Sequence, residues 1–161
     1  MRKQLVNVLT KFSLLGAIVL VTTVASAQGQ SLANRIRANI PFDFSIGDKE
    51  LPSGKYSVGR ARQNSDDTVL SLTDVDGRSK AISTSSPTLT SRVKDNPTLV
   101  FHRYGDHYFL FQVWPAGETT GRQFSKSRRE REIERNQVGN SPVGTAENVE
   151  VETVTIVGVM Q

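Results

Sequence analysis

Two histidines, His102 and His107, are the side chains of this sequence best suited to metal binding or proton transfer. Imidazole is the commonest metal ligand in proteins, and it exchanges its proton near neutral pH. Both histidines lie in the stretch LVFHRYGDHYFLFQVW, residues 99–114, which is the densest run of aromatic and apolar side chains in the chain. The candidate binding surface at its centre consists of His102, Tyr104, His107 and Phe109.

The spacing of the histidines predicts a hairpin rather than a metal site. A two-residue turn at Gly105 and Asp106 would join strands 98–104 and 107–114. In that register the four candidates share one face, and the two histidines are diagonal neighbours about 7–8 Å apart at Cα. A metal would need a third ligand, and Asp106 belongs to the turn itself. In the alternative, a three-residue turn through His107, the histidines lie on opposite faces. Neither register predicts a metal site, a catalytic residue or a cofactor.

Other catalytic classes lack their sequence motifs. The chain contains no cysteine, which excludes thiol chemistry and disulfides. It has no G-x-S-x-G nucleophile elbow and no glycine-rich phosphate loop after a strand. Most acidic residues fall in turns or on the polar face of a strand, and not as an inward-facing pair. We therefore expect a non-enzymatic protein, with a metal-dependent hydrolase as the least favoured alternative.

The hairpin also has to be buried on both sides. In the two-residue register, one face carries Val100, Phe111 and Val113, and the other carries Leu99, Phe101, Leu110, Gln112 and Trp114. Two apolar faces are typical of a central strand pair that is covered twice. The second cover is either a partner or another part of the same chain, such as its C-terminal segment.

The rest of the sequence predicts short strands separated by turns. Strict alternation over 36–46 indicates a half-buried strand, in which Pro41 marks an edge or a bulge. Further strands are expected at 55–60, 68–73, 79–83, 98–104 and 107–114, with a turn at 47–54 and a loop at 84–97. The expected fold of residues 35–123 is all-β, an antiparallel β-sandwich or partly open barrel of six to seven strands.

A short charged helix is expected after this domain, within residues 124–136. Ser127 and Glu130 have the S-x-x-E form of a capping box, and good helix formers follow. The basic residues of this segment would contact anionic lipid, a cell-wall polymer or an acidic partner, or they would form a solvated face with ion pairs such as Arg128 with Glu132.

The C-terminal residues, 137–161, are expected to be a flexible tail. Residues 137–148 are typical of a linker, because they are rich in Gly, Asn and other polar residues. Residues 149–159 are β-prone, and they form either a terminal strand or a disordered end.

The N-terminal residues have the pattern of a secretory signal peptide. Basic residues at Arg2, Lys3 and Lys11 precede an apolar run, and Ala25-Ser26-Ala27 has the form of a cleavage site. We expect cleavage after Ala27, a linker over 28–34, and a mature protein in the periplasm or outside the cell.

Cleavage would also change the charge of the protein. Residues 1–27 hold three of the 20 basic residues and none of the 16 acidic ones, so the mature chain carries a net charge of about +1. This balance argues against nucleic-acid binding, and removal of the leader argues against stable membrane insertion. The expected partner is another protein or a component of the cell envelope, and a second copy of the chain would make a homo-oligomer.

Three stretches together resemble an uncharacterised family of small exported proteins that is frequent in acidobacteria. They are IPFDFSIGDKELPSGKYSV (40–58), LVFHRYGDHYFLFQVW (99–114) and GRQFSKSRRERE (121–132). The family has no assigned activity or binding residues, so the resemblance implies none. The stretch LPSGKYSV is also similar to a turn and strand of many extracellular β-sandwich modules, and that likeness implies an architecture only.

These features predict an exported, non-enzymatic envelope or secreted module that binds a partner or has a structural role. The alternative is a carrier of a small apolar ligand within the barrel.

Overall fold

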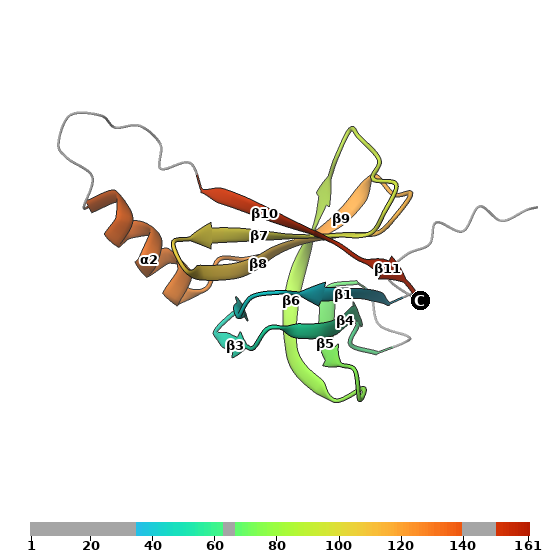
Figure 1. The fold of residues 1–161 in the computed structure, drawn as a ribbon. Helices are drawn as coiled ribbons and strands as arrows, with labels where there is room; N and C mark the ends of the chain where they lie inside the picture. Colours follow the sequence, from blue (N-terminus) through green and yellow to red (C-terminus); the bar gives the residue numbers. More distant parts are fainter. Residues whose placement is uncertain (1–34, 63–66, 140–150) are drawn as a thin grey trace, which may run out of the picture.

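The computed structural model describes residues 35–62, 67–139 and 151–161, which form eleven β-strands and one α-helix (Figure 1). The β class expected from the sequence is confirmed, although the described strands number eleven rather than six or seven. Three of them, β2, β3 and β11, have three residues or fewer. The elements are β1 (Ile36–Ile40), β2 (Phe44–Ile46), β3 (Lys49–Leu51), β4 (Gly54–Arg60), β5 (Val69–Asp74), β6 (Ser79–Leu89), β7 (Thr98–Tyr104), β8 (His107–Trp114), β9 (Thr120–Phe124), α2 (Arg128–Gly139), β10 (Glu152–Val157) and β11 (Val159–Met160).

The strands follow one path, in the order β10-β7-β8-β9-β6-β5-β4-β1-β11. Strand β6 belongs to both halves of this path, because it pairs with β5 as far as Thr84 and with β9 from Ser85 onward. We call β11, β1, β4, β5 and the first part of β6 sheet A, and the remaining strands sheet B. The path is not closed into a barrel, and β2 pairs with β8 in parallel through Ser45 and Phe109. The sheet is therefore mixed, and the expectation of a wholly antiparallel sheet was wrong.

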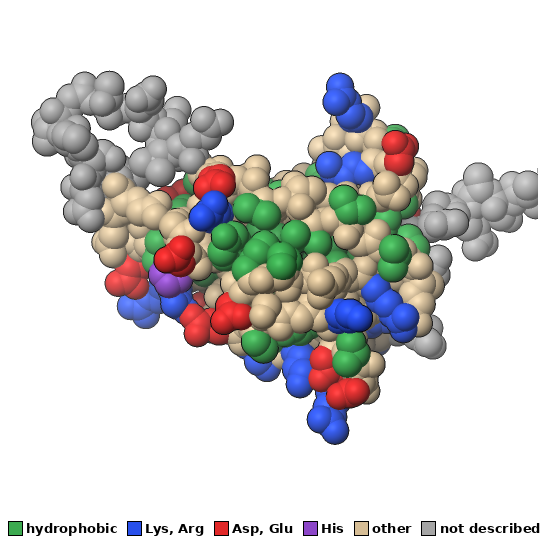
Figure 2. Space-filling model, in the orientation of Figure 1, with side chains coloured by type: hydrophobic (Ala, Val, Ile, Leu, Met, Phe, Trp, Pro, Cys, Tyr) green, Lys and Arg blue, Asp and Glu red, His purple; other side chains and the backbone are tan. Residues whose placement is uncertain are grey.

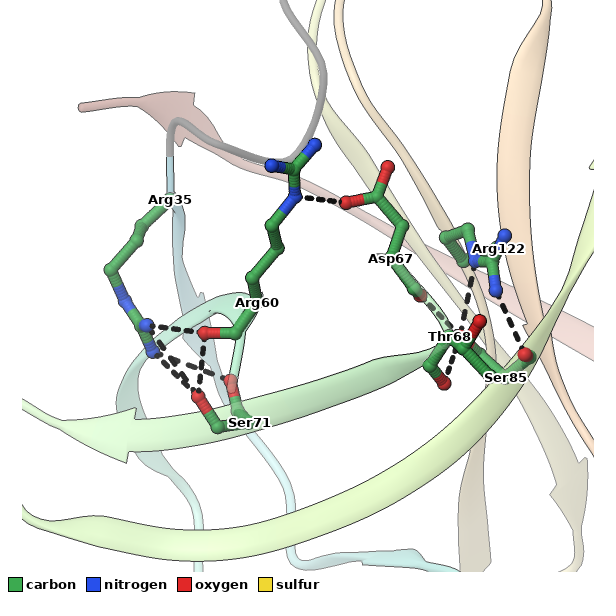
Figure 3. A network of polar contacts seen from close by, with 7 residues as sticks. All are labelled: Arg35, Arg60, Asp67, Thr68, Ser71, Ser85 and Arg122. Carbon is green, nitrogen blue, oxygen red and sulfur yellow. Dashed lines mark hydrogen bonds and ion pairs between the residues drawn. The ribbon is translucent and has the colours of Figure 1, made fainter. Parts of the chain in front are cut away.

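Hydrogen bonds around Ser85 hold the point where β6 passes from sheet A to sheet B (Figure 3). The Ser85 amide donates to the carbonyl of Thr68 at 2.7 Å, and the Ser85 hydroxyl donates to the carbonyl of Asp67 at 3.0 Å. Arg122 of β9 donates to the Ser85 carbonyl at 2.8 Å, and Arg60 of β4 forms an ion pair with Asp67. Because strands β4, β6 and β9 and the turn before β5 all contribute, this corner fixes how the two sheets meet.

Two prolines explain where the observed strands differ from the expected ones. The expected strand 36–46 is divided at Pro41, which cannot donate to a ladder, into β1 and β2. The prediction of a loop over 84–97 was wrong for its first residues, because β6 continues to Leu89 beside β9. Pro87 is tolerated there because β5 no longer pairs with this part of β6, which leaves one edge without a ladder partner. Strand β3 lies within the turn predicted at 47–54 and pairs with β2 around Gly47, whose φ is +57°.

Both sheets contribute to one hydrophobic core. The inner residues of β1 alternate with exposed ones, as the sequence predicted. Fully buried side chains from strands of both sheets form this core, among them Ile36, Ile40, Val58, Leu70, Leu72, Leu99, Phe101 and Val113. Figure 2 also shows hydrophobic side chains at the surface between β10 and β1.

The C-terminal segment forms both ends of the strand path. Strand β10 runs antiparallel to β7, and β11 runs antiparallel to β1. Gly158 lies between them, and its amide donates to the carbonyl of Pro97 at 2.8 Å. Of the two alternatives for 149–159, the structure shows a strand from Glu152 onward. Residues 140–150 lie outside the described residues.

The expected signal peptide and the linker that follows it, residues 1–34, also lie outside the described residues. Within the parts of the chain that the structure does describe, no helix combines the length and apolar character needed to cross a bilayer.

Gly158 provides a test of how closely the C-terminal segment must approach β1. A Cβ atom at this position would lie 2.6 Å from the carbonyl oxygen of Arg37 and 2.9 Å from Cγ2 of Ile36. We expect Gly158→Val to lower the free energy of unfolding by about 1–3 kcal/mol through overpacking. Urea denaturation followed by the fluorescence of Trp114 measures this. The neighbouring exposed position gives the control, Val157→Ala, and equal losses in both variants would contradict the close approach.

Candidate functional site

The structure brings the four predicted surface residues to one face of the β7–β8 hairpin. Tyr104 pairs with His107 and His102 pairs with Phe109, and Gly105 has a φ of +61°, so the turn has two residues. Three of the side chains are nevertheless buried, with exposed fractions of 6% for His102 and 2% for both Tyr104 and Phe109. Only His107 of the four is exposed. Three of the four candidate side chains therefore belong to the packed interior, and they do not form an accessible binding surface.

A β-bulge changes the predicted faces of the hairpin further from its tip. Phe101 still pairs with Leu110, but Val100 pairs with Gln112, so Phe111 is the extra residue. The bulge moves Val113 to the core side beside Leu99, and it moves Gln112 and Trp114 to the opposite side. The assignment of Val113 to the histidine face was therefore wrong.

Helix α2 covers the histidine face through a buried carboxylate. The hydroxyl of Ser127 accepts a hydrogen bond from the amide of Glu130 at 3.1 Å, which confirms the Ser127 half of the predicted capping box. One oxygen of the Glu130 carboxylate lies 2.7 Å from Nδ1 of His102, and the hydroxyl of Tyr104 donates to the same oxygen at 3.4 Å. We call Glu130, His102 and Tyr104 the Glu130 cluster. It joins the first turn of the helix to strand β7.

The environment of the Glu130 cluster favours a structural role. Glu130 is 5% exposed, and the ring of Phe111 stacks on the ring of His102 with centroids 3.8 Å apart. Burial, and then the charge of Glu130, raise the pKa of the Tyr104 phenol above its usual value. The carboxylate receives hydrogen bonds from within the chain, as a buried charge requires.

A groove lies on the outer face of sheet A. It has a volume of about 660 Å³ and is lined by residues from 35–39, 55–57, 73–77 and 157–161. Its floor follows from the strand register, since Arg37 of β1 lies between Val159 of β11 and Ser57 of β4, and Ser57 lies opposite Thr73 of β5. The turn after β5 and the C-terminal segment form its sides.

Arg35 extends across the floor of this groove. Its Cγ passes over Gly59, where an added Cβ would lie only 2.9 Å away. The guanidinium donates to the Ser57 hydroxyl at 3.0 Å, to the Ser57 carbonyl at 3.1 Å and to the Thr73 hydroxyl at 3.1 Å, and it also contacts Ser71 (Figure 3). Burial lowers the pKa of Arg35, but a guanidinium stays charged at neutral pH. Its acceptors among the described residues are neutral hydroxyl and carbonyl oxygens, and no described Asp or Glu side chain forms an ion pair with it.

The other charged residues of the groove leave it basic. Arg37 and Lys55 line it with exposed side chains, and Asp74 is the one acidic side chain in its described lining. Lys80 lies 2.9 Å from Asp74, and two backbone amides donate to the same carboxylate. These contacts, the bond from Lys80 first, hold the pKa of Asp74 below its usual value, although burial acts in the opposite direction. The acid is therefore already paired, and Figure 2 shows basic side chains in the region of β1, β4 and β11.

The two sides of the groove expose apolar side chains. Val75 belongs to the turn after β5 and is 73% exposed, and Val157 and Val159 flank Gly158 with exposed fractions of 61% and 63%. These are three of the most exposed large hydrophobic residues in the described chain. Apolar sides around a few charged groups are typical of small-molecule sites.

Nothing in the sequence alone marked this groove as a site. Its residues come from four distant segments, and Arg37, Asn39 and Ser57 have the spacing of an ordinary solvated strand face. The one available signal was Gly59, because an isolated glycine inside a strand indicates the close approach of another group. Glu130 was marked as a capping residue, but its buried contact with His102 depends on how α2 docks.

The described residues contain no group of three or more His, Cys, Asp or Glu side chains placed to hold a metal ion. The two histidines, in particular, differ in environment, since His102 is buried against Glu130 and His107 is exposed near the hairpin tip.

Removal of the Glu130 carboxylate tests whether α2 is anchored by it. We expect Glu130→Ala to lower the free energy of unfolding by roughly 3 kcal/mol, because the buried His102 Nδ1 and Tyr104 hydroxyl lose their acceptor. Glu130→Gln keeps an amide oxygen as acceptor, and its loss is expected to be smaller. Urea denaturation measures both, with the exposed Glu132→Ala as control. A loss in Glu130→Ala no larger than in the control would contradict the anchor.

The raised pKa of Tyr104 predicts a loss of stability at alkaline pH. Above about pH 10 an unfolded tyrosine ionises, while the folded Tyr104 phenol keeps its proton, so the unfolded state is favoured as pH rises. The wild-type protein should therefore lose more stability between about pH 9 and about pH 11 than Tyr104→Phe does. Parallel denaturation curves at the two pH values measure the difference, and equal losses would refute it.

Comparison of the chain with protein-family models, with curated proteins and with solved structures gives no match in any of the three.

Proposed function

We propose that the protein is a non-enzymatic, exported module that binds its partner in the groove on the outer face of sheet A. The observation that carries the proposal is the groove itself, whose volume of about 660 Å³ falls within the range of small-molecule sites. Strands β1 and β4, the turn after β5 and the C-terminal segment all line it. A hollow formed by four segments is positioned by the fold rather than by one loop.

The groove supports binding better than the hairpin does. Helix α2 covers the histidine face, where Tyr104 and Phe109 are each 2% exposed, and the core covers the other face. The domain's own chain thus supplies both covers that the sequence required. The groove, by contrast, keeps Arg37, Lys55 and Val159 exposed on a face that no other described element covers.

The chemistry of the groove favours holding a molecule over transforming it. Its described lining includes no histidine or cysteine, and the carboxylate of Asp74 is paired with Lys80. The hydroxyls of Ser57 and Thr73 accept hydrogen bonds from Arg35, and a nucleophilic serine or threonine would need a neighbouring base instead. These side chains therefore determine the charge and the shape of the groove.

The remaining parts of the proposal rest on the sequence. Export to the periplasm or the exterior rests on the pattern of residues 1–27, and likeness to the acidobacterial family rests on the three stretches quoted above. A sandwich architecture is supported by the single core to which both sheets contribute. A carrier that encloses an apolar ligand in the interior is less favoured, because Leu72, Phe101 and Val113 fill that space and are 0% exposed.

A groove-filling variant tests the proposal. Asn39 is exposed and lines the groove, so Asn39→Trp would occupy its space, and Ile82→Trp places the same side chain on β6, outside the groove lining. The protein is isolated from the envelope of its own host and weighed by native mass spectrometry. We expect a small bound molecule on the wild type and on Ile82→Trp but not on Asn39→Trp. A wild type without a bound molecule, or binding unchanged by Asn39→Trp, would refute the proposal.

A further inference from the structure

We infer that the groove takes a single-chain amphiphilic anion, a molecule with one negatively charged head group and one apolar chain. The inference rests on the proposed function, and it adds the chemical class of the ligand. It follows from three observations: the unbalanced positive charge of the floor, the pairing of the one acidic residue in the described lining, and the exposed valines of the two sides.

The head group is assigned to Arg37 and Lys55. Arg37 lies opposite Ser57 on the neighbouring strand, so Lys55, two residues before Ser57, is its diagonal neighbour on the same face. Diagonal neighbours lie about 7–8 Å apart at Cα, and two long cationic side chains can converge on one head group over that distance. Asn39 lies opposite Lys55 and adds an amide donor to the same place.

Arg35 contributes charge beneath the head group rather than a direct contact. Its hydrogen bonds go to neutral hydroxyl and carbonyl oxygens, which belong to Ser57, Arg60, Ser71 and Thr73. A partly buried cation without a carboxylate partner keeps a positive potential at the groove floor, and that potential favours an anion.

The one acidic side chain of the described lining is already paired. Asp74, the acidic residue of the lining, already receives Lys80 and the amides of Asp76 and Arg78. The groove is therefore basic even though the mature chain as a whole is expected to be nearly neutral. An anion bound in the groove would balance this positive charge.

The apolar chain is assigned to the sides of the groove. Val75 lies on one side and Val157 and Val159 on the other, and all three are more than half exposed. Covering such valines with an apolar group is favourable, because it removes their apolar surface from water. A charged ligand without an apolar chain would leave the valines in contact with water. An apolar ligand without a charge would leave the positive charge of the groove floor unbalanced.

The shape of the site favours one molecule over a membrane surface. The groove is a hollow with two sides and a volume of about 660 Å³, which suits a single small molecule. We therefore assign the site to a free amphiphile, and membrane binding becomes an outcome that the experiment distinguishes.

Calorimetric titration with defined probes tests this assignment on the mature chain. The probe is decanoate below its micellar concentration, and decanol and propionate each lack one of its two features. We expect decanoate to bind at least about tenfold more tightly than either decanol or propionate. Equal affinity for decanol would show that charge is not recognised, and equal affinity for propionate would show that the chain is not. Either result would overturn the inference.

Variants locate the binding and separate it from other surfaces. The double substitution Arg37→Gln with Lys55→Gln should weaken decanoate binding by about tenfold or more and leave decanol binding unchanged. Lys49→Gln removes an exposed basic residue of β3 outside the groove and serves as the matched control. Decanoate binding that survives the double substitution would place the ligand elsewhere. Binding to anionic lipid vesicles without binding of free decanoate would replace the assignment with a membrane surface.

The experiments also distinguish the groove as a binding site from the chemical class of its ligand. A host molecule that is lost from Asn39→Trp, together with no decanoate binding, would retain the groove and refute the amphiphilic anion. Absence of both would refute the groove as a binding site.

Discussion

The apolar character of both faces of the β7–β8 hairpin is the constraint that organises this protein. One face packs into the core that sheets A and B share, and the other requires a second cover. Helix α2 supplies that cover, although its sequence is almost wholly polar, because Glu130 enters the contact as a hydrogen-bonded carboxylate. Strand β10 then pairs with the outer edge of β7. The core, helix α2 and strand β10 thus all contact the apolar stretch of residues 99–114.

Two charged groups in the structure illustrate opposite solutions to burial. The carboxylate of Glu130 finds its donors, His102 and Tyr104, within the domain. The guanidinium of Arg35 finds hydroxyls and carbonyls, but no described carboxylate, and two more basic side chains lie near it in the groove. The first arrangement is complete in itself and holds a helix in place. The second leaves a charge to be balanced from outside, and this difference is why the groove and not the hairpin is the better candidate for binding.

Local patterns in the sequence predicted the local structure well. Alternation from Ile36 to Ile40, the turn at Gly105 and the cap at Ser127 all depend on residues that are neighbours in the chain. The errors arose where distant segments decide the outcome. The strand at 84–89 exists because β9 lies beside it, and the bulge at Phe111 changes the face of Val113 without any signal in composition. The groove could not be predicted for the same reason, since its floor joins strands that only the sheet order brings together.

The pairing of the C-terminal segment with both β7 and β1 has a consequence for the order in which the protein folds. Ile36 pairs with Met160, so two positions near opposite ends of the described chain must meet before the strand path is complete. Contacts of such long sequence separation form slowly, and until they form the edges of β7 and β1 remain open to other chains. A nascent chain held by a translocation channel or a chaperone would lack Val157 and Val159 beside sheet A. The groove therefore exists only in a molecule that has finished folding, and a bound ligand would report that this last step has taken place.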